Sequence, residues 1–108
     1  GVFDLKQDPG GIIDVEFIVQ YLILAHAHSY PDLTDNLGNI ALLHRAAEHG
    51  LIPEAQANAV QKAYRDYRRL QHANRLNDDP KARLPMTPEL QANINAVLAL
   101  KQGVFGTA

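Results

Sequence analysis

Apolar residues recur at spacings of three and four along most of the chain, and glycine or proline separates the recurring segments. Positions i, i+3, i+4 and i+7 share one face of a helix, so this pattern predicts helices. We expect four of them, at residues 12–28, 36–49, 53–76 and 88–102. No segment alternates apolar and polar residues with β-branched enrichment, so no strand is expected inside the domain.

Helix boundaries follow from the residues between these segments. The first helix should stop before Pro31, because the residue before a proline is pushed out of the α region. Gly50 can end the second helix in a left-handed conformation, and Pro53 suits the first turn of the third. Thr87 can cap the fourth helix, and Gly103 is expected to end it.

The predicted fold class is all-α, an antiparallel four-helix bundle with short connections. Residues 2–5 are expected to be a short extended lead-in, within a segment 1–11 that ends in a Gly-Gly turn. Residues 12–108 then form a single helical-bundle domain. Because the chain begins at Gly1 without an initiating methionine, we interpret it as a fragment of a larger multidomain protein.

The first helix is apolar almost all round, which is typical of a helix in the middle of a bundle or beneath another domain. Three short neighbours are not expected to cover it, so some of Ile12, Val15 and Val19 should remain exposed as part of a contact surface. The helical stripes predict these buried core residues: Phe17, Tyr21, Leu43, Val60, Tyr67 and Leu98.

Composition excludes several classes of protein. A chain of 108 residues suits one modest core. The net charge of −2 gives no reason to expect nucleic acid or an anionic membrane as a partner. The chain has no cysteine, which excludes disulfides and thiolate metal sites and fits a reducing cytosol. Charged and polar residues interrupt the most apolar stretch, 12–27, so it is not expected to span a membrane.

A glycine pair, Gly10 and Gly11, opens directly into the first helix, with Lys6 and Asp8 just before it. Glycines let backbone N–H groups approach an anion, and a helix N-terminus favours phosphate. The same Asp-Pro-Gly-Gly run is a turn signature, so a pure turn is the alternative.

Two carboxylates follow in the first helix. Asp14 lies in the first turn, where capping and the helix dipole stabilise a carboxylate by about 0.3–1 kcal/mol, so a structural role and a site role both stay open. Glu16 stands among apolar residues, and a buried carboxylate needs a partner, which we expect in a neighbouring domain. Two positions apart, the side chains point to nearly opposite faces.

Basic residues share one face of the third helix. This face is either solvated, with Asp66 as a partial counter-charge, or a dock for an acidic surface or a nucleotide phosphate. Its members are Arg65, Arg68, Arg69, His72 and Arg75. The five histidines match no zinc spacing, so no metal site is expected.

Residues 4–22, DLKQDPGGIIDVEFIVQYL, resemble the motif that begins the helical domain of glutamine synthetase adenylyltransferases. That motif reads Asp-Leu-Lys, a gap, Gly-Gly, two residues, Asp, an aliphatic residue, Glu-Phe, two residues and Gln-Tyr. Residues 64–72, YRDYRRLQH, resemble the family's Tyr-x-x-x-Arg-x-Leu-x-His-like segment. Related uridylyltransferases share the Lys and Gly-Gly portion but diverge around Glu-Phe.

The resemblance implies a nucleotidyltransferase-associated helical domain in a cytoplasmic enzyme of nitrogen metabolism. One half of such an enzyme transfers AMP from ATP to a tyrosine of glutamine synthetase, and the other half removes it. The implied cofactors of the parent are Mg²⁺ and ATP. The implied partners are an upstream catalytic domain, glutamine synthetase and the signalling protein PII. The catalytic domain's Gly-Ser-x-Asp-x-Asp-like motif is absent from residues 1–108, so this fragment should be inactive alone and bind no cofactor.

The resemblance also selects residues. Ile13 precedes Asp14 where the amino-terminal module tends to carry Arg, and the chain stops soon after its fourth helix, which points to the C-terminal, adenylylating module. A non-catalytic interaction module and the helical domain of a PII uridylyltransferase are the alternatives. The candidates for nucleotide or domain-interface contact are Lys6, Asp8, Gly10, Gly11, Asp14 and Glu16.

Overall fold

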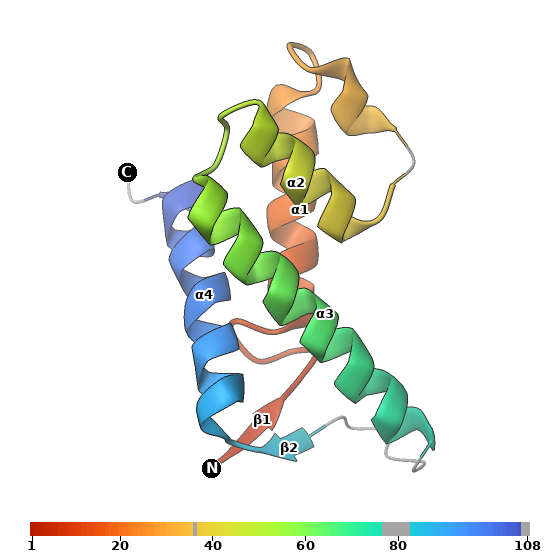
Figure 1. The fold of residues 1–108 in the computed structure, drawn as a ribbon, viewed down its shortest axis with the longest axis vertical. Helices are drawn as coiled ribbons and strands as arrows, with labels where there is room; N and C mark the ends of the chain where they lie inside the picture. The colour runs from red at the N-terminus through yellow and green to blue at the C-terminus, as the bar shows by residue number, and fades with distance from the viewer. Residues whose placement is uncertain (36, 77–82, 107–108) are drawn as a thin grey trace.

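The computed structural model describes residues 1–35, 37–76 and 83–106, without the side chains of residues 74–76. Within these ranges the chain is mostly helical, with four α-helices and a two-stranded sheet (Figure 1). None of the helices in these ranges is both long and apolar enough to cross a membrane. The elements in chain order are β1 (Val2–Asp4), α1 (Ile12–His26), a 3-10 turn η1 (Pro31–Thr34), α2 (Asn39–Glu48), α3 (Glu54–Leu76), β2 (Arg83–Pro85) and α4 (Pro88–Phe105).

The long helix α3 is the centre of the arrangement, and it packs against each of the other three helices. In Figure 1, α4 runs beside it, while α1 and α2 cover its first half. The two strands lie at the opposite end from α2, where β1 pairs with β2 in antiparallel register. The pairing joins the lead-in segment to the chain just before α4.

The expectation of no strand inside the domain is wrong at β2. Residues 83–85 show no alternation, and one of the three is proline. Their partner is β1, where Phe3 lies opposite Leu84. A pairing between segments this far apart leaves no local signal in the sequence. The extended lead-in expected at residues 2–5 is confirmed at residues 2–4, which form β1, while Leu5 already belongs to the turn.

Most helix boundaries agree with the capping residues. Gly50 adopts a positive φ of 76° after α2, and the Thr87 hydroxyl accepts the Leu90 N–H at 3.1 Å. The expectation that Gly103 ends α4 is wrong. A glycine inside a helix costs only about 1 kcal/mol relative to alanine, and the next residue, Val104, packs against the core, so the helix continues. It ends at Gly106, with φ of 63°.

Half of the predicted core is confirmed. Leu43, Val60 and Tyr67 are fully buried. The predictions for three others are wrong, because Phe17 is 62%, Tyr21 41% and Leu98 36% exposed.

The inner face of α1 also differs from the expectation. Ile12, Val15 and Val19, some of which were expected to remain exposed, are all buried together with Ile18 and Leu22. Since α1 is apolar on every side, the pattern of its apolar residues does not specify which side turns inward.

Candidate functional site

The glycine pair forms a closed turn. The Gly10 N–H donates to Oδ2 of Asp14 at 2.7 Å, and the Gly11 N–H donates to the Asp8 carbonyl at 2.9 Å. Asp8 also accepts the Asp4 N–H through Oδ2 at 2.8 Å. Both glycine donors therefore have partners inside the turn.

The next two N–H groups at the start of α1 are also occupied. Ile12 donates to the Leu5 carbonyl at 2.9 Å, and Ile13 donates to the Lys6 carbonyl at 3.1 Å. The preceding loop therefore already supplies acceptors for these two N–H groups, as a pure turn would. The pure-turn alternative accounts for the glycines.

Close packing explains why the turn needs glycine. Gly10 has φ of 86°, a conformation that L side chains rarely adopt, and a Cβ there would lie 2.8 Å from Cγ2 of Ile94. A Cβ at Gly11 would lie 2.5 Å from the Leu5 carbonyl oxygen. The buried Tyr67 hydroxyl donates to the Gly10 carbonyl at 2.8 Å. The turn is therefore fastened to both α3 and α4.

Burial is the main reason that the pKa of Tyr67 is raised above its usual value, and the charges of Asp66 and Asp14 add to it. The phenol therefore stays protonated and remains a donor to the turn.

Asp14 connects two helices. The Lys101 amine lies 3.2 Å from Oδ1 and 3.3 Å from Oδ2, while Oδ2 also accepts the Gly10 N–H. Sequence reasoning assigned no partner to Asp14. It missed the ion pair, because nothing local links residues so far apart.

The six site candidates therefore divide into two groups. Asp8, Gly10, Gly11 and Asp14 are brought together as parts of the turn. Lys6 and Glu16 are exposed. Glu16 lies away from the inner face of α1, so any partner for it would have to come from a neighbouring domain, and that expectation stays a prediction.

The described residues do not fit a divalent metal at this turn. Asp14 is occupied by a lysine amine and a backbone N–H, and Glu16 lies in solvent. No group of three or more histidine, aspartate or glutamate side chains in the described ranges could hold a metal ion.

The basic face on α3 remains open to solvent at Arg65, Arg68, Arg69 and His72. The side chain of Arg75 lies outside the described residues. Arg69 is paired with Asp66, at 3.1 Å between Nη2 and Oδ1.

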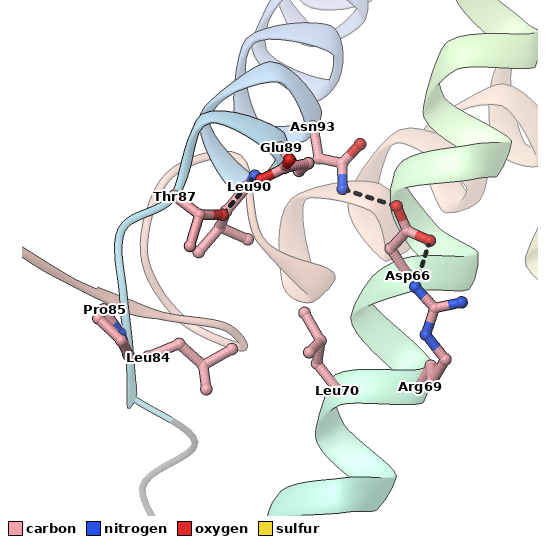
Figure 2. Close-up of a pocket in the computed structure, with 9 residues that line it drawn as sticks. All are labelled: Asp66, Arg69, Leu70, Leu84, Pro85, Thr87, Glu89, Leu90 and Asn93. Atoms are coloured by element: carbon pink, nitrogen blue, oxygen red, sulfur yellow. Dashed lines mark hydrogen bonds and ion pairs between the residues drawn. The ribbon is translucent and has the colours of Figure 1, made fainter.

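A cavity of about 290 Å³ opens beside this face, between α3, β2 and the start of α4. Figure 2 shows Asn93 and Arg69 both directed at Asp66 on its wall. Sequence reasoning treated Asp66 only as a counter-charge and did not find the cavity, because β2 was not predicted. The lining residues are Asp66, Arg69, Leu70, Leu84, Pro85, Thr87, Glu89, Leu90 and Asn93.

Asp66 is the charged centre of this region. Burial opposes its charged form, but hydrogen bonds from Lys62 at 2.9 Å and Asn93 at 3.0 Å outweigh that effect. The positive charges of Lys62 and Arg69 act in the same direction. The pKa of Asp66 is therefore below its usual value, and the carboxylate stays ionised at neutral pH.

A further polar cluster fastens η1 to α2. The Nε2–H of the His49 ring donates to Oδ1 of Asp32 at 2.9 Å, and the ring stacks on Tyr30 with 4.2 Å between ring centroids. Arg45 donates to Asp35 at 2.6 Å and to the Asp32 carbonyl at 2.7 Å. These contacts explain one histidine as a structural residue.

Large apolar side chains gather on the outer side of α1 and α4. The Tyr21 and Phe105 rings contact each other across the two helices, with 5.1 Å between centroids. This α1–α4 apolar surface consists of Phe17, Tyr21, Leu24, Leu98 and Phe105, all exposed.

Comparisons with known proteins match nearly the whole chain. The family model described as GlnD PII-uridylyltransferase matches residues 2–103. The bifunctional glutamine synthetase adenylyltransferase/adenylyl-removing enzyme of Aromatoleum aromaticum is 53% identical over 106 residues, covering 98% of this chain and 11% of that protein. The proteins of the same name from Nitrosomonas eutropha and Neisseria meningitidis serogroup A are 49% and 52% identical, over 98% and 95% of this chain and 13% and 11% of their own lengths.

The chain therefore spans about a tenth of the length of the curated relatives it matches. No solved structure matches it.

Proposed function

The chain belongs to the family described as GlnD PII-uridylyltransferase, and because its relatives carry the adenylyltransferase name, we propose that it is the helical domain of a glutamine synthetase adenylyltransferase. The parent enzyme would transfer AMP from ATP to a tyrosine of glutamine synthetase and, in its other half, remove it. The observation that supports this most is identity of 53% over 98% of the chain. Identity at that level extends far beyond the glycine motif.

The proposal assigns the chemistry to the rest of the parent. ATP and Mg²⁺ would bind to an upstream catalytic domain, and PII would regulate the enzyme in the cytoplasm. The present chain would be the helical domain of its C-terminal module, with residues 12–108 as an antiparallel four-helix bundle behind the lead-in segment 1–11. The contacts of α3 with all three other helices support such a bundle.

The six site candidates keep two roles in this proposal. Asp8, Gly10, Gly11 and Asp14 would give the turn its shape, which their mutual hydrogen bonds support. Lys6 and Glu16, both exposed, would contact the nucleotide or the catalytic domain. The basic face of Arg65, Arg68, Arg69 and Arg75 would meet an acidic partner surface.

Labelled nucleotides test the proposal. The full-length parent, given labelled ATP, Mg²⁺ and glutamine synthetase, should label glutamine synthetase. The isolated 108-residue chain should not label it, because the catalytic motif is absent from its sequence. Robust labelling by the isolated chain would contradict the assignment of chemistry to the parent's other domains.

A second candidate is the helical domain of a PII uridylyltransferase, which the family model over residues 2–103 favours. The same parent protein, given labelled UTP and PII, would then label PII and leave glutamine synthetase unlabelled with ATP. A parent that labels neither protein would favour the non-catalytic interaction module.

A further inference from the structure

The residues of the α1–α4 apolar surface include every wrong core prediction. Phe17, Tyr21 and Leu98 were expected in the core from their helical spacing. Phe17 and Tyr21 line the groove of this surface, and Leu98 lies seven positions before Phe105, on the same face of α4. Leu24 extends the surface and is 75% exposed. The helical spacing of Phe17, Tyr21 and Leu98 predicts burial, yet these large apolar side chains are exposed together. Such a cluster indicates a surface that another part of the protein, or a partner, covers.

The surface is continuous across two helices that contact each other. On α1, residues 17, 21 and 24 follow one another at spacings of four and three, and residues 98 and 105 of α4 are seven apart. Each stripe therefore runs for about 10 Å at about 1.5 Å per residue. Between the helices lies a shallow groove of about 500 Å³. Neighbouring helices form such grooves, and ridges of a third helix pack into them.

The charge in the groove selects the kind of occupant. Its charged lining residues are Asp14 and Lys101, and these neutralise each other in the ion pair at 3.2 Å. The remaining lining side chains are Gln20 and the apolar residues Phe17, Tyr21, Leu24 and Phe105. An occupant gains little from charge here and gains most from burying apolar surface. A strongly basic or acidic segment is therefore not the expected occupant of the groove.

We infer that one apolar face of a helix from the rest of the parent polypeptide covers the α1–α4 apolar surface. The occupant would present apolar residues at i, i+3 or i+4, and i+7, over two to three turns. The match covers only 11% of the length of the Aromatoleum aromaticum relative. A parent of that length contains many other segments, any of which could supply the covering helix. The inference rests on the proposed function only in placing the chain within such a longer polypeptide.

Hydroxyl-radical footprinting of the full-length parent tests the inference. The oxidation rate of each residue is divided by its rate in the denatured protein, which removes intrinsic reactivity. Leu24 and Leu37 are a matched pair of leucines, 75% and 38% exposed in the present structure. A free surface gives Leu24 the faster normalised rate, whereas a covered surface reverses the order. We expect Leu24 to oxidise at least threefold more slowly than Leu37, with Phe17 protected alongside it.

The outcomes separate the possible occupants. Equal or faster oxidation of Leu24 overturns the inference. Protection that disappears on dilution, in step with dissociation seen by light scattering, assigns the surface to a second copy and also overturns it. If Leu24 is protected only when glutamine synthetase is added, the surface is covered by a separate protein, which also overturns the inference. Protection that persists in the dilute parent alone supports an intramolecular helix.

Two variants add an independent readout. Leu24→Asp should raise the normalised oxidation of Phe17 several-fold in the parent, and Leu37→Asp should leave it unchanged. No rise in the Leu24→Asp protein contradicts the inference. AMP transfer measured on the same preparation separates the two proposals. If the parent transfers AMP to glutamine synthetase but Leu24 is not protected, the inference is wrong and the proposed function stands. If Leu24 is protected but the parent transfers no AMP to glutamine synthetase, the proposed function is wrong and the inference stands.

Discussion

The Lys101 amine lies 3.2 Å from Oδ1 of Asp14, 87 positions earlier in the chain, and this pair joins the first turn of α1 to α4. Asp14 is the one member of the sequence motif whose side chain both closes the glycine turn and reaches another helix in the described structure.

Asp14→Asn should destabilise the chain by about 1 kcal/mol, because the ion pair is lost while an amide oxygen can still accept the Gly10 N–H. Thermal unfolding of the 108-residue chain measures the loss. Lys101→Met should cost a similar amount, and the double variant should cost less than the sum, since both changes remove the same contact. Additive losses would show that the two side chains do not interact.

Gly10→Ala should destabilise by about 1–3 kcal/mol, because φ is 86° and the new Cβ would lie 2.8 Å from Ile94. Gly103→Ala is the matched control inside α4. Its Cβ would meet its nearest neighbour, Oε1 of Gln56, at 3.8 Å, so it should stabilise by up to about 1 kcal/mol. Equal effects of the two changes in urea unfolding would refute the close packing of the turn.

Phe17→Ala should change the stability of the isolated chain by less than about 1 kcal/mol, because its side chain is 62% exposed. Leu43→Ala, at a fully buried position, should cost about 2–5 kcal/mol. Calorimetric melting of both variants checks the difference. A large loss at Phe17 in the isolated chain would mean that its ring packs inside the domain.

Asp66→Asn should destabilise by about 1–3 kcal/mol at pH 7 through lost charge-assisted hydrogen bonds from Lys62 and Asn93. The folded-state pKa of Asp66 is lowered, so its contribution is present above the unfolded pKa of about 3.9 and is lost as pH falls through the folded value. The difference in the free energy of unfolding between wild type and the Asp66→Asn variant should therefore become smaller in acid. Urea unfolding at pH 7 and pH 3 tests this. A gap of constant size would contradict the role of the ionised carboxylate.

Lys6→Ala in the full-length parent should lower AMP transfer at least tenfold, because the proposal brings the exposed Lys6 amine into contact with the nucleotide or the catalytic domain. The melting temperature should not change, because Lys6 holds the turn through its backbone N–H and carbonyl. Gln7→Ala, its exposed neighbour, is the control and should leave transfer unchanged. Unchanged transfer in the Lys6 variant would leave the motif with only its structural role.

Local chemistry predicted the helices well. Gly50 and Thr87 act through contacts within one turn, so their roles could be read from the sequence. The orientation of α1 could not be predicted, since apolar residues surround the whole helix and the choice of inner side depends on its neighbours.

The candidate site could be predicted only in part, for the same reason. The glycine turn was recognised from the sequence, but the acceptors of its N–H groups could not be assigned. Tyr67 and Lys101 act on the turn from distant helices. The cavity beside Asp66 depends on the pairing of Phe3 with Leu84, which no local pattern specifies.

The antiparallel pairing of β1 with β2 has a consequence for the order of folding. Mostly helical domains fold fast because their contacts are local. Here the strand pair, the Tyr67–Gly10 bond and the Lys101–Asp14 pair join segments 57 to 87 positions apart. Closing such loops costs chain entropy before any contact is gained. The α2–α3 and α3–α4 pairs, each adjacent in sequence, should therefore form first, and α1 should dock last, with the glycine turn closing behind it.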